Sequence, residues 1–507
     1  MKKRILVHFF AGVLYFIAVL SCATAPDGGG NGNPSSSISS VYLSSSGNSS
    51  SAVSSAKVIY VSVLGNDTNS GTITSPVKTV QQALSKAEDG FSIYIAKGIY
   101  TPGNGLNTES AEYSNSGIYI KMSNVNIIGG WETNFSSRSG FSELDGNFVL
   151  KHILWINNVT NVTIDGFVLR RGLANDMNMP HNCGGGIFIN LGREVKITNI
   201  VVSNNTAFNG GGIYIQYGTN HNVWATISYN IASNSGGGLY IDGGMSNSID
   251  GIIRTNIAIY HGGGIYLNGG MGHTTKSTLK IISNSAFAGG GLWINYGIGH
   301  NIFSTISYNS VSNVGGGMVL WNGLRNNISA WIISYNSAKD NGGGIYLYYG
   351  SNNTISGPIV NNISYLYGGG INAFGELNSS IIGGNIVSNI ASQRGGGIFL
   401  SMVSNFSISG SVSYNNAQYY GGGIYIINST NCRIGGQIKY NIATNYADGG
   451  GGVFFYDSAY NNTHIFNSPT IETNSKYGIA RSNTNSNPQG TNTINWGTGN
   501  YPANMNW

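Results

Sequence analysis

Charged side chains are scarce in this chain. Asp, Glu, Lys and Arg together make up 8% of the 507 residues, against roughly 25% in ordinary soluble domains. Lys2, Lys3 and Arg4 lie in a segment that the mature protein is expected to lose, and the remaining cations form no run or stripe. Nucleic acid is therefore not expected as a partner, because binding to phosphates needs a basic patch.

Long apolar runs are also rare, and the clearest one lies at the N-terminus. Residues 5–20 are apolar, follow a basic start and are too few for a comfortable membrane span, so residues 1–21 are expected to be a secretory signal peptide. The segment 19–22, Val-Leu-Ser-Cys, resembles the lipobox of bacterial lipoproteins. That resemblance implies a diacylated Cys22 as the new N-terminus, and hence a membrane partner through a lipid anchor at the bacterial outer membrane or cell surface. An ordinary signal peptide cleaved near residues 23–25 is the alternative.

Glycine is abundant, and its arrangement is the dominant feature of the sequence. A triplet of glycines followed by an aliphatic residue occurs eleven times, at separations of 26 or 27 residues and finally 29. A fixed period of this length indicates a stacked array of similar coils. The residues after the triplets are Ile187, Ile213, Leu239, Ile265, Leu292, Met318, Ile345, Ile371, Ile398, Ile424 and Val453.

Each repeat contains three short strand-like pieces separated by turns. In residues 395–421 these pieces are GGGIFL, FSIS and SVSYN, with Gly410 as a bend and Asn415 opening the turn back to the next triplet. We therefore predict an all-β, single-stranded right-handed parallel β-helix with about 26–27 residues per coil. An amphipathic helix with Ser75 as N-cap, Pro76 in its first turn and Gly90 past its end should cap the N-terminal coil.

A column of asparagines repeats in step with the glycines. Stacked corners would place these amides in a ladder, each bonded to the next. The ladder members are Asn205, Asn230, Asn256, Asn284, Asn309, Asn336, Asn362, Asn389, Asn415 and Asn441. The expected organisation is a lipidated cysteine and flexible tether over 22–56, a cap and first coils over 57–183, the glycine repeat over 184–460, and a C-terminal coil and cap over 461–507.

The repeat resembles that of the bacterial polymorphic outer-membrane proteins. Those proteins pair F-x-x-N with G-G-A-[ILV], and here residues 227–230, ISYN, pair with residues 236–239, GGGL. Residues 58–102 also resemble the N-terminal segment of secreted right-handed β-helix proteins. Both resemblances imply the fold but leave lyases, hydrolases and adhesins open. Because no barrel-sized set of strands follows residue 461, surface display is expected to use the lipid anchor.

Metal sites and disulfides are not expected in the repeats. Cys183 and Cys432 belong to distant coils, too far apart for a disulfide, and should be small buried residues. No zinc spacing occurs, and the eight His residues show no repeat-matched pair. The oxygen-rich loop 66–69 could hold Ca²⁺, although a simple turn is the favoured interpretation; no cofactor is expected.

Aromatic residues recur two places after the glycine triplet. The flanking first and third positions are aliphatic and should face the core, so the second should point outward. Aromatic faces beside amides suit binding to sugar rings or to another protein, while mutual stacking of the rings is the simpler alternative. The candidate ligand-binding residues are Tyr214, Tyr240, Tyr266, Trp293, Tyr346, Phe399 and Tyr425.

Catalytic groups are hard to find, because acids are few. Asp242, Asp250 and Arg254 are the nearest approach to a catalytic cluster, yet they fall on different strands of one coil. We therefore predict a monomeric, non-enzymatic binding or adhesion protein for a glycan or an extracellular protein. A polysaccharide lyase or glycoside hydrolase is the first alternative, and a passive surface-coat protein is the second.

Overall fold

The structure is a computed structural model that describes residues 57–107, 115–445, 449–456, 463–472, 474, 479–482 and 493–496. The predicted signal peptide, Cys22 and the tether lie outside the described residues. Within the described ranges, no helix has the length and apolar character needed to cross a bilayer.

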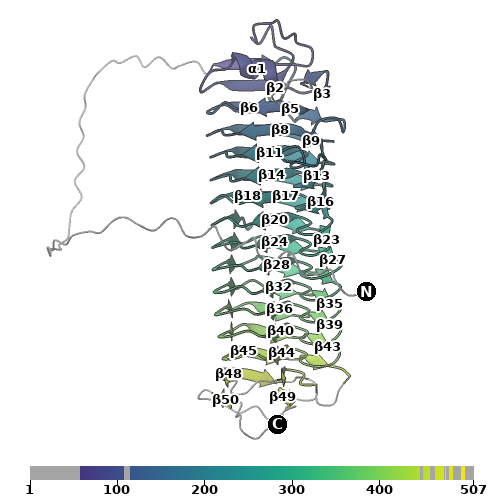
Figure 1. The fold of residues 1–507 in the computed structure, drawn as a ribbon, viewed down its shortest axis with the longest axis vertical. Coiled ribbons are helices and arrows are strands. Elements are labelled where there is room, and N and C mark those ends of the chain that lie inside the picture. The colour runs from purple at the N-terminus through teal and green to yellow at the C-terminus, as the bar shows by residue number, and fades with distance from the viewer. Residues whose placement is uncertain are drawn as a thin grey trace, which may run out of the picture. The chain divides into compact units, whose positions relative to one another are not determined.

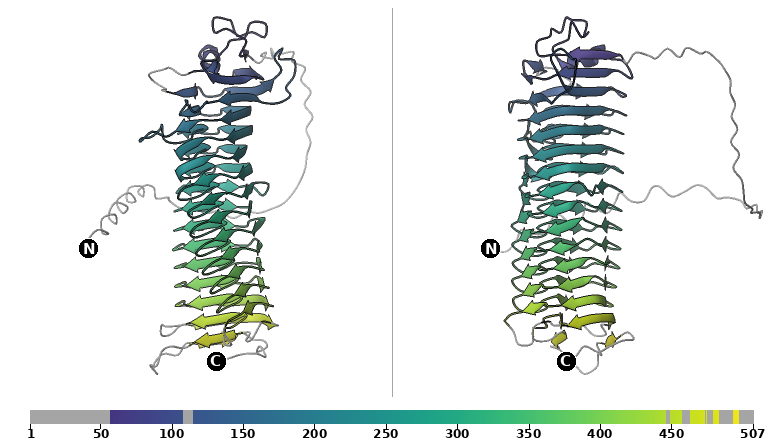
Figure 2. Two further views of the ribbon diagram at one scale, coloured as in Figure 1. Left: turned by 90° about the vertical axis from the view of Figure 1, so that its right-hand side faces the viewer. Right: turned by 180° about the vertical axis from the view of Figure 1, so that it is seen from behind.

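The described chain winds through stacked coils whose strands pair in parallel with their counterparts in the coils before and after (Figures 1 and 2). The strands form three sheets. The predicted right-handed parallel β-helix is therefore confirmed, and the hand is the one that crossover connections between parallel strands adopt. Because each coil contacts only its neighbours, equivalent residues form columns along the stack.

The first sheet, here called the triplet sheet, contains the strands that follow the glycine triplets. Its strands are β5 (Ser116–Ile120), β8 (His152–Asn157), β11 (Ile187–Asn190), β14 (Ile213–Gln216), β17 (Leu239–Asp242), β20 (Ile265–Asn268), β24 (Leu292–Asn295), β28 (Met318–Trp321), β32 (Ile345–Tyr348), β36 (Ile371–Phe374), β40 (Ile398–Ser401), β44 (Ile424–Ile427), β47 (Val453–Tyr456) and β49 (Ile479–Ser482).

The second sheet, the large sheet, contains β1 to β4 and the strands between the triplet sheet and the asparagine column. Its strands are β1 (Val58–Val61), β2 (Ser92–Ala96), β3 (Ile99–Pro102), β4 (Gly105–Leu106), β6 (Asn126–Trp131), β7 (Ser142–Asp145), β9 (Thr163–Arg170), β12 (Lys196–Ser203), β15 (Asn222–Ser228), β18 (Ser248–Arg254), β21 (Thr274–Thr275), β22 (Lys280–Ile282), β25 (Asn301–Ile302), β26 (Thr305–Ser307), β29 (Asn327–Ile328), β30 (Ile332–Ser334), β33 (Thr354–Ile355), β34 (Ile359–Val360), β37 (Ser380–Ile381), β38 (Asn385–Val387), β41 (Ser407–Ile408), β42 (Ser411–Ser413), β45 (Arg433–Lys439), β48 (Thr463–Glu472) and β50 (Thr493–Trp496).

The third sheet, the ladder sheet, follows the asparagine column and was missed in the sequence, where this segment was expected to be a turn. Its strands are mostly two residues long, too short to show an alternating pattern, and the two pieces predicted before Asn415 both belong to the large sheet. The strands are β10 (Leu173–Ala174), β13 (Thr206–Asn209), β16 (Ile231–Ser235), β19 (Ile257–Ala258), β23 (Ser285–Ala286), β27 (Ser310–Val311), β31 (Ser337–Ala338), β35 (Ile363–Ser364), β39 (Ile390–Ala391), β43 (Asn416–Ala417) and β46 (Ile442–Ala443).

The glycines of a triplet are needed for two different reasons. The first glycine has a left-handed backbone, as at Gly236 with φ +69°, which side chains tolerate poorly. The second and third lie against the next coil: a Cβ on Gly237 would lie 2.4 Å from the Gly263 oxygen, and one on Gly238 would lie 2.7 Å from the Gly264 oxygen. The triplet is thus a corner where φ is positive and where the coils approach closely.

The predicted asparagine ladder is present and buried. In the pair Asn230 and Asn256, Oδ1 of Asn256 accepts both the backbone N–H and the side-chain N–H of Asn230, each over 3.0 Å. The left-handed residue of this corner is the one before the ladder member, such as Tyr229, rather than the asparagine itself. The ladder continues from Asn441 to Asn474, whose Oδ1 accepts the Asn441 backbone N–H over 2.9 Å.

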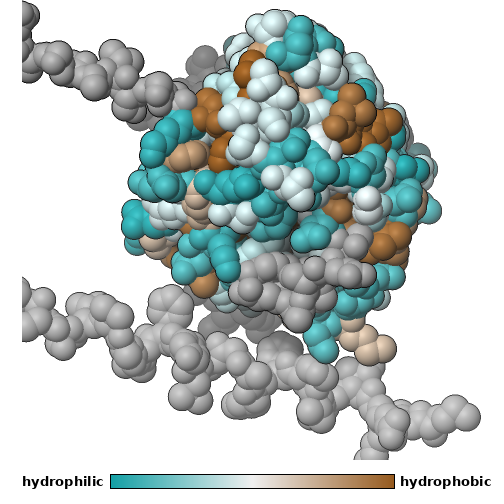
Figure 3. Space-filling model, turned by 90° about the horizontal axis from the view of Figure 1, so that it is seen from above, coloured by the Kyte–Doolittle hydropathy of each residue, from teal (hydrophilic) through white to brown (hydrophobic). Residues whose placement is uncertain are grey.

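Helix α1 (Val80–Lys86) packs against the N-terminal end of the core through Val80, Ala83 and Leu84, as expected for a cap. Its N-cap is Thr79, which accepts the Gln82 N–H, and the prediction of Ser75 is wrong. The helix begins later because Val77 is extended and pairs with Val61 of β1. Seen from this end, the surface is largely polar with separate apolar patches (Figure 3).

The core between the sheets is a continuous column of aliphatic side chains. First and third positions after the triplet, such as Ile213 and Ile215, lie in it as predicted. Cys183 and Cys432 are both buried and are not joined to each other, in agreement with the sequence.

Candidate functional site

The predicted aromatic column points away from the core, but it does not lie open on the surface. Its rings form clusters separate from the aliphatic core, so the outward direction is correct. The expected exposure is wrong: Tyr214, Tyr240, Tyr266, Trp293, Phe399 and Tyr425 are all 9% exposed or less, and Tyr346 is half-buried.

These rings are buried because they cover one another and are flanked by the residue before each triplet. The ring centroids of Tyr214 and Tyr240 lie 4.9 Å apart, and those of Tyr240 and Tyr266 lie 4.7 Å apart. From the flanking column, His261 lies 4.3 Å from Trp293. Burial raises the pKa of Tyr266 to about 12, so its phenol stays protonated at neutral pH. The simpler alternative, mutual stacking, describes the second-position column.

The ring stack changes column part-way along the triplet sheet. Val319 replaces an aromatic residue at the second position, and the stack continues through the fourth position. Trp293 lies 5.8 Å from Trp321, which lies 3.9 Å from Tyr348. Trp321 and Tyr348 are half-buried, so the stack reaches solvent in these coils.

The fourth position of the earlier coils carries a row of half-exposed polar groups. We call this the amide row; its members are Asn157, Asn190, Gln216, Asp242, Asn268 and Asn295. Hydrogen bonds run along parts of it, from Asn190 Nδ2 to Asn157 Oδ1 over 2.9 Å and from Asn268 Nδ2 to Asp242 Oδ1 over 2.8 Å. Each amide that bonds to its neighbours keeps further donor or acceptor capacity for a ligand.

The three candidate catalytic residues, Asp242, Asp250 and Arg254, do not form a cluster in the structure. Asp242 lies on β17 of the triplet sheet, where the Tyr214 hydroxyl donates to its Oδ2 over 3.0 Å. Asp250 and Arg254 lie on β18 of the large sheet, and Asp250 accepts the Thr278 hydroxyl over 2.7 Å. Within the described residues, no hydrogen bond or ion pair joins Asp242 to Asp250 or to Arg254.

Exposed rings occur at the fifth position after the triplet, where the strand ends. Tyr217, Tyr296 and Tyr349 are 56%, 60% and 52% exposed and have φ of 50°, 51° and 49°. We call these three residues the rim tyrosines. A Cβ on Gly243 would lie 2.9 Å from Tyr217 Cδ1, and one on Gly375 would lie 2.5 Å from Tyr349 Cδ1. The rings of Tyr217 and Tyr349 therefore lie over the glycine at the fifth position of the next coil.

Strand alternation could not reveal these rings. Strict alternation places the fifth position inside, but the backbone turns left-handed there and projects the side chain outward. The signal that could have revealed them is the composition of this column, because Asn322, Asn428, Gly243, Gly269 and Gly375 occupy it in other coils, although Leu191 and Met402 do so too. Asn and Gly are the residues typical of a left-handed backbone.

A second set of exposed tyrosines precedes the asparagine ladder. Tyr308 and Tyr335 stack with centroids 5.0 Å apart, and Tyr414 and Tyr440 stack at 4.8 Å. Each ring of these pairs therefore has a tyrosine partner in the adjacent coil. The rim tyrosines do not contact one another, since three coils separate Tyr217 from Tyr296 and two separate Tyr296 from Tyr349. Tyr349 contacts Phe374 of the adjacent coil edge-on, with centroids 5.4 Å apart.

Three histidines share a buried column, so the expectation that no His pair matches the repeat is wrong. His221, His273 and His300 lie in line with Asn247 and Asn326. The backbone N–H of Asn247 donates to His273 Nδ1 over 3.3 Å, as that of His300 donates to Asn326 Oδ1 over 2.9 Å. Imidazole and amide play the same structural part here.

The carboxylate of the loop considered for Ca²⁺ is hydrogen-bonded within the protein. In the loop considered for Ca²⁺, Asp67 Oδ1 accepts the backbone N–H groups of Lys78 and Thr79 over 2.9 and 2.8 Å, and ties the loop to the start of α1. In the part of the chain that the structure describes, no group of at least three His, Cys, Asp or Glu side chains is placed to hold a metal ion.

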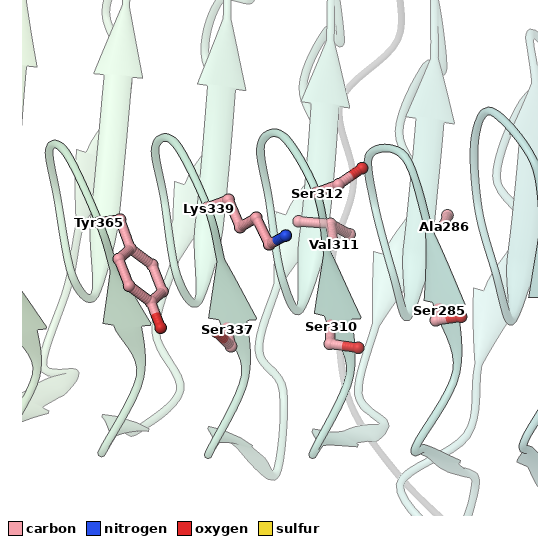
Figure 4. A pocket seen from close by; sticks show the side chains of 8 residues that line it. All are labelled: Ser285, Ala286, Ser310, Val311, Ser312, Ser337, Lys339 and Tyr365. Carbon is pink, nitrogen blue, oxygen red and sulfur yellow. The ribbon is translucent and has the colours of Figure 1, made fainter.

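A shallow depression of about 310 Å³ lies on the ladder sheet (Figure 4). Ser285, Ser310 and Ser337 line it from successive strands. Lys339 extends toward the coil of Val311, and Tyr365 lies beside it (Figure 4). A second depression, of about 330 Å³, lies on the triplet sheet beside Trp155 and Gln216, where it adjoins the amide row.

Comparison with known proteins supports the fold. The family model for the right-handed β-helix region matches residues 326–494. A search among curated proteins finds no match to this sequence.

Two solved structures are similar to this chain. A rhamnogalacturonan lyase has 13% identity and a TM-score of 0.25, covering 62% of this chain and 83% of its own. A GH136 lacto-N-biosidase from Eubacterium ramulus has 10% identity and a TM-score of 0.27, covering 82% of this chain and 68% of its own. At these TM-scores neither likeness bears on the activity of this protein.

Proposed function

We propose that the protein binds an extended carbohydrate chain, without cleaving it, along the amide row and the rim tyrosines of the triplet sheet. The observation that carries the proposal is the position of the rim tyrosines, whose rings are more than half exposed directly after the fourth position, with that of Tyr349 packed edge-on against Tyr348 and Phe374. At the strand spacing, three and two coils place Tyr217, Tyr296 and Tyr349 about 14 Å and about 10 Å apart. Flat rings at intervals, beside amides from successive coils, suit a linear ligand with repeated hydroxyl groups.

Backbone conformation shows that these rings are not needed to form the turn. A tyrosine with a left-handed backbone is strained relative to Asn or Gly. Other coils place Asn322 and Asn428, and also Leu191 and Met402, in the same column. The fold therefore does not require tyrosine at the positions of Tyr217, Tyr296 and Tyr349.

The proposal is tested by measuring retention of the protein on a panel of immobilised neutral and acidic polysaccharides. Replacement of the three rim tyrosines by Asn should weaken binding at least tenfold, because the stacking surfaces are removed. The matched control replaces Tyr308, Tyr335 and Tyr414 by Asn, at left-handed positions of another corner. Absence of any retained polysaccharide, or an equal loss in the control, would refute the proposal.

The enzymatic alternative has a separate test. Release of unsaturated or reducing sugar from a uronate polymer, abolished in Asp242→Ala, would show that the protein is a lyase or hydrolase. Asp242 is the relevant residue because it is the carboxylate of the amide row. We expect no such release.

The cellular setting that we propose is the bacterial outer membrane or cell surface. A diacylated Cys22 would hold the protein there, the tether over 22–56 would separate the β-helix from the membrane, and the protein would act as a monomer. The two acyl chains together are sufficient for stable anchoring. An extracellular protein, rather than a glycan, remains the second candidate for the ligand, because exposed tyrosines also suit protein contacts.

A further inference from the structure

One coil of the β-helix carries an inserted loop. Gly172 occupies the ladder position, since its N–H donates to Asn205 Oδ1 over 2.9 Å. Gly172 precedes the next triplet, at Gly184, by 12 residues, whereas the equivalent separation is 5 from Asn205 to Gly210. Insertions in repeat proteins form loops that are often part of the binding face.

The inserted loop, residues 175–182, is held against the sheets on both sides. Asp176 forms an ion pair with Lys151. At the other end of the loop, the Cys183 N–H donates to the Pro180 oxygen over 3.0 Å, and the Phe208 N–H donates to the Asn182 oxygen over 2.8 Å. The loop therefore has a defined position over the adjoining strands.

A pocket of about 330 Å³ lies between this loop and the triplet sheet. Met179 and Pro180 line it from the loop, and the sheet contributes an aromatic pair and part of the amide row. The rings of Trp155 and Phe188 have centroids 5.9 Å apart. The remaining lining residues are Asn157, Asn190 and Gln216.

One lining residue, Trp155, and two histidines whose rings lie 5.5 and 5.7 Å from it carry polar atoms without partners. Among the described residues, Trp155 Nε1 and, behind it, His152 Nε2 and His181 Nδ1 are buried with no hydrogen-bond partner. Gln216 is the member of the amide row whose side chain bonds to neither neighbour, while Asn190 bonds to Asn157 and Asn268 to Asp242. Buried polar groups are rarely left unpaired, so a cluster of them beside a pocket points to a ligand.

The histidine packed against Trp155 is neutral and does not line the pocket. His152 is fully buried, and its Nδ1 lies 3.0 Å from the Gly184 oxygen, which fixes Nδ1 as the donor. Burial lowers the pKa of His152 to about 4, so the imidazole is neutral at pH 7 and Nε2 keeps its lone pair. The pocket thus has an indole with an unpaired N–H, the Gln216 amide, and the amides of Asn157 and Asn190, which are partly engaged with each other.

We propose that this pocket binds one neutral sugar residue. The sugar ring would lie against Trp155 and Phe188, with hydroxyls paired to the Trp155 N–H and the Gln216 amide. An acidic sugar fits poorly, because no charged residue lines the pocket and the adjacent Lys151 is already paired with Asp176. The inference deepens the proposed function, since the pocket lies at the Asn157 end of the amide row and would hold one end of the chain.

The test follows Trp155 directly in the full chain labelled with 5-fluorotryptophan. Its 19F resonance is assigned by its loss in Trp155→Phe. The probes are neutral tetrasaccharides (gluco-, xylo-, manno- and N-acetylglucosamine-based) and, as the acidic arm, tetragalacturonate. At least one neutral probe should shift the Trp155 resonance saturably, and tetragalacturonate should not.

Gln216→Ala should lower the affinity for the neutral probe about 3- to 10-fold, which is the effect of one lost hydrogen bond. Gln437→Ala, an exposed glutamine on the large sheet, is the matched control and should leave the affinity unchanged. The inference is overturned if no neutral probe moves the Trp155 resonance. Equal affinities in the two glutamine variants, or tighter binding of tetragalacturonate, would also overturn it.

The result separates this inference from the proposed function. If the neutral probe binds at Trp155 but binding of no polysaccharide depends on the rim tyrosines, the sugar pocket is supported and the extended site is refuted. If polysaccharide binding depends on the rim tyrosines while the Trp155 resonance does not shift, the extended site is supported and the sugar pocket is refuted.

Discussion

The backbone N–H of His273 donates to Nδ1 of His300 over 3.1 Å, with the two imidazole rings 4.8 Å apart. On its other side, His273 Nε2 lies 3.1 Å from the Gly243 oxygen. Asn326, one coil beyond His300, makes the same pair of bonds with its amide, accepting the His300 N–H and donating to the Gly297 oxygen. A neutral imidazole therefore substitutes for an amide in this column, and a protonated one cannot, because its Nδ1 would no longer accept.

This arrangement makes the β-helix sensitive to acid. Burial lowers the pKa of His221 and of His273 to about 4, and that of His300 to about 3, from the usual 6.5. The unfolded chain binds these protons first, so the stability that each neutral histidine contributes is complete above pH 6.5 and is lost as pH falls toward 4 for His221 and His273 and toward 3 for His300. The loss is about 1.4 kcal/mol per pH unit for each histidine.

His273→Asn isolates this effect, because Asn can make both bonds without titrating. The variant should unfold at the same urea concentration as the natural chain at pH 7.5, and at a higher one at pH 4.5. Comparing the two proteins at each pH removes the contributions of other buried groups such as Glu376. Parallel pH profiles would contradict the prediction.

Two glycines five residues apart should differ in how far their substitution lowers stability. A Cβ on Gly264 would lie 2.6 Å from the Gly291 oxygen of the next coil, whereas one on Gly269 meets nothing within 4 Å. Gly264→Ala should cost at least about 2 kcal/mol through overpacking. Gly269→Asn should be nearly neutral, since Asn suits its φ of +63°. Thermal melting followed by circular dichroism measures both, and a similar fall in melting temperature for the two variants would refute the account.

The asparagine ladder should contribute strongly to stability at each step. Asn309 Oδ1 accepts the backbone N–H of Asn284 over 2.9 Å and its amide N–H over 3.1 Å, while Asn309 Nδ2 donates to the Ile281 oxygen over 3.0 Å. Asn309→Ala leaves the buried Asn284 backbone N–H without its acceptor and removes one partner each from the Asn284 amide and the Ile281 oxygen, so we expect a loss of about 3 kcal/mol in urea denaturation. Asn327→Ala, at a half-buried position, should cost under about 1 kcal/mol. A small effect at Asn309 would show that the ladder is not a major source of stability.

The architecture could be predicted because it repeats. A period of 26 or 27 residues, with glycine at one corner and asparagine at another, allows few solutions besides a parallel β-helix. The ladder sheet escaped prediction because strands such as Ser310–Val311 are too short to show alternation. The start of α1 was placed too early because Val77 pairs with β1, a contact between distant residues that local helix signals do not contain.

The site was harder to predict than the fold. The direction of Tyr214 followed from alternation, but its burial depends on stacking against Phe188 and Tyr240 in adjacent coils. The exposure of Tyr217 depends on a left-handed turn that a sequence pattern expresses only through Asn and Gly in the same column. The pocket at Trp155 depends on an inserted loop folding back over the sheet, which the repeat itself does not encode.

Lipidation at Cys22 remains a prediction from the sequence, and it can be tested alone. Cells expressing the natural chain should incorporate radiolabelled palmitate into the protein, and Cys22→Ala should remove the label and release the protein from the membrane fraction. Cys183→Ala is the control, because that thiol is buried, and it should be labelled like the natural chain. Label that persists in Cys22→Ala would show that this cysteine is not the acylated one.

Replacement of the rim tyrosines should abolish binding without lowering the stability of the protein. Tyr217, Tyr296 and Tyr349 each hold a left-handed backbone with the ring about half exposed, so replacement by Asn relieves strain and removes little buried surface. The triple Asn variant should therefore melt at the same temperature as the natural chain or a few degrees higher, while it loses polysaccharide binding. A clear fall in melting temperature would indicate that the rings stabilise the corners of the β-helix, and that the column is structural like the buried stack beside it. Unchanged stability without any change in binding would leave the strained tyrosines unexplained and would count against the proposed function.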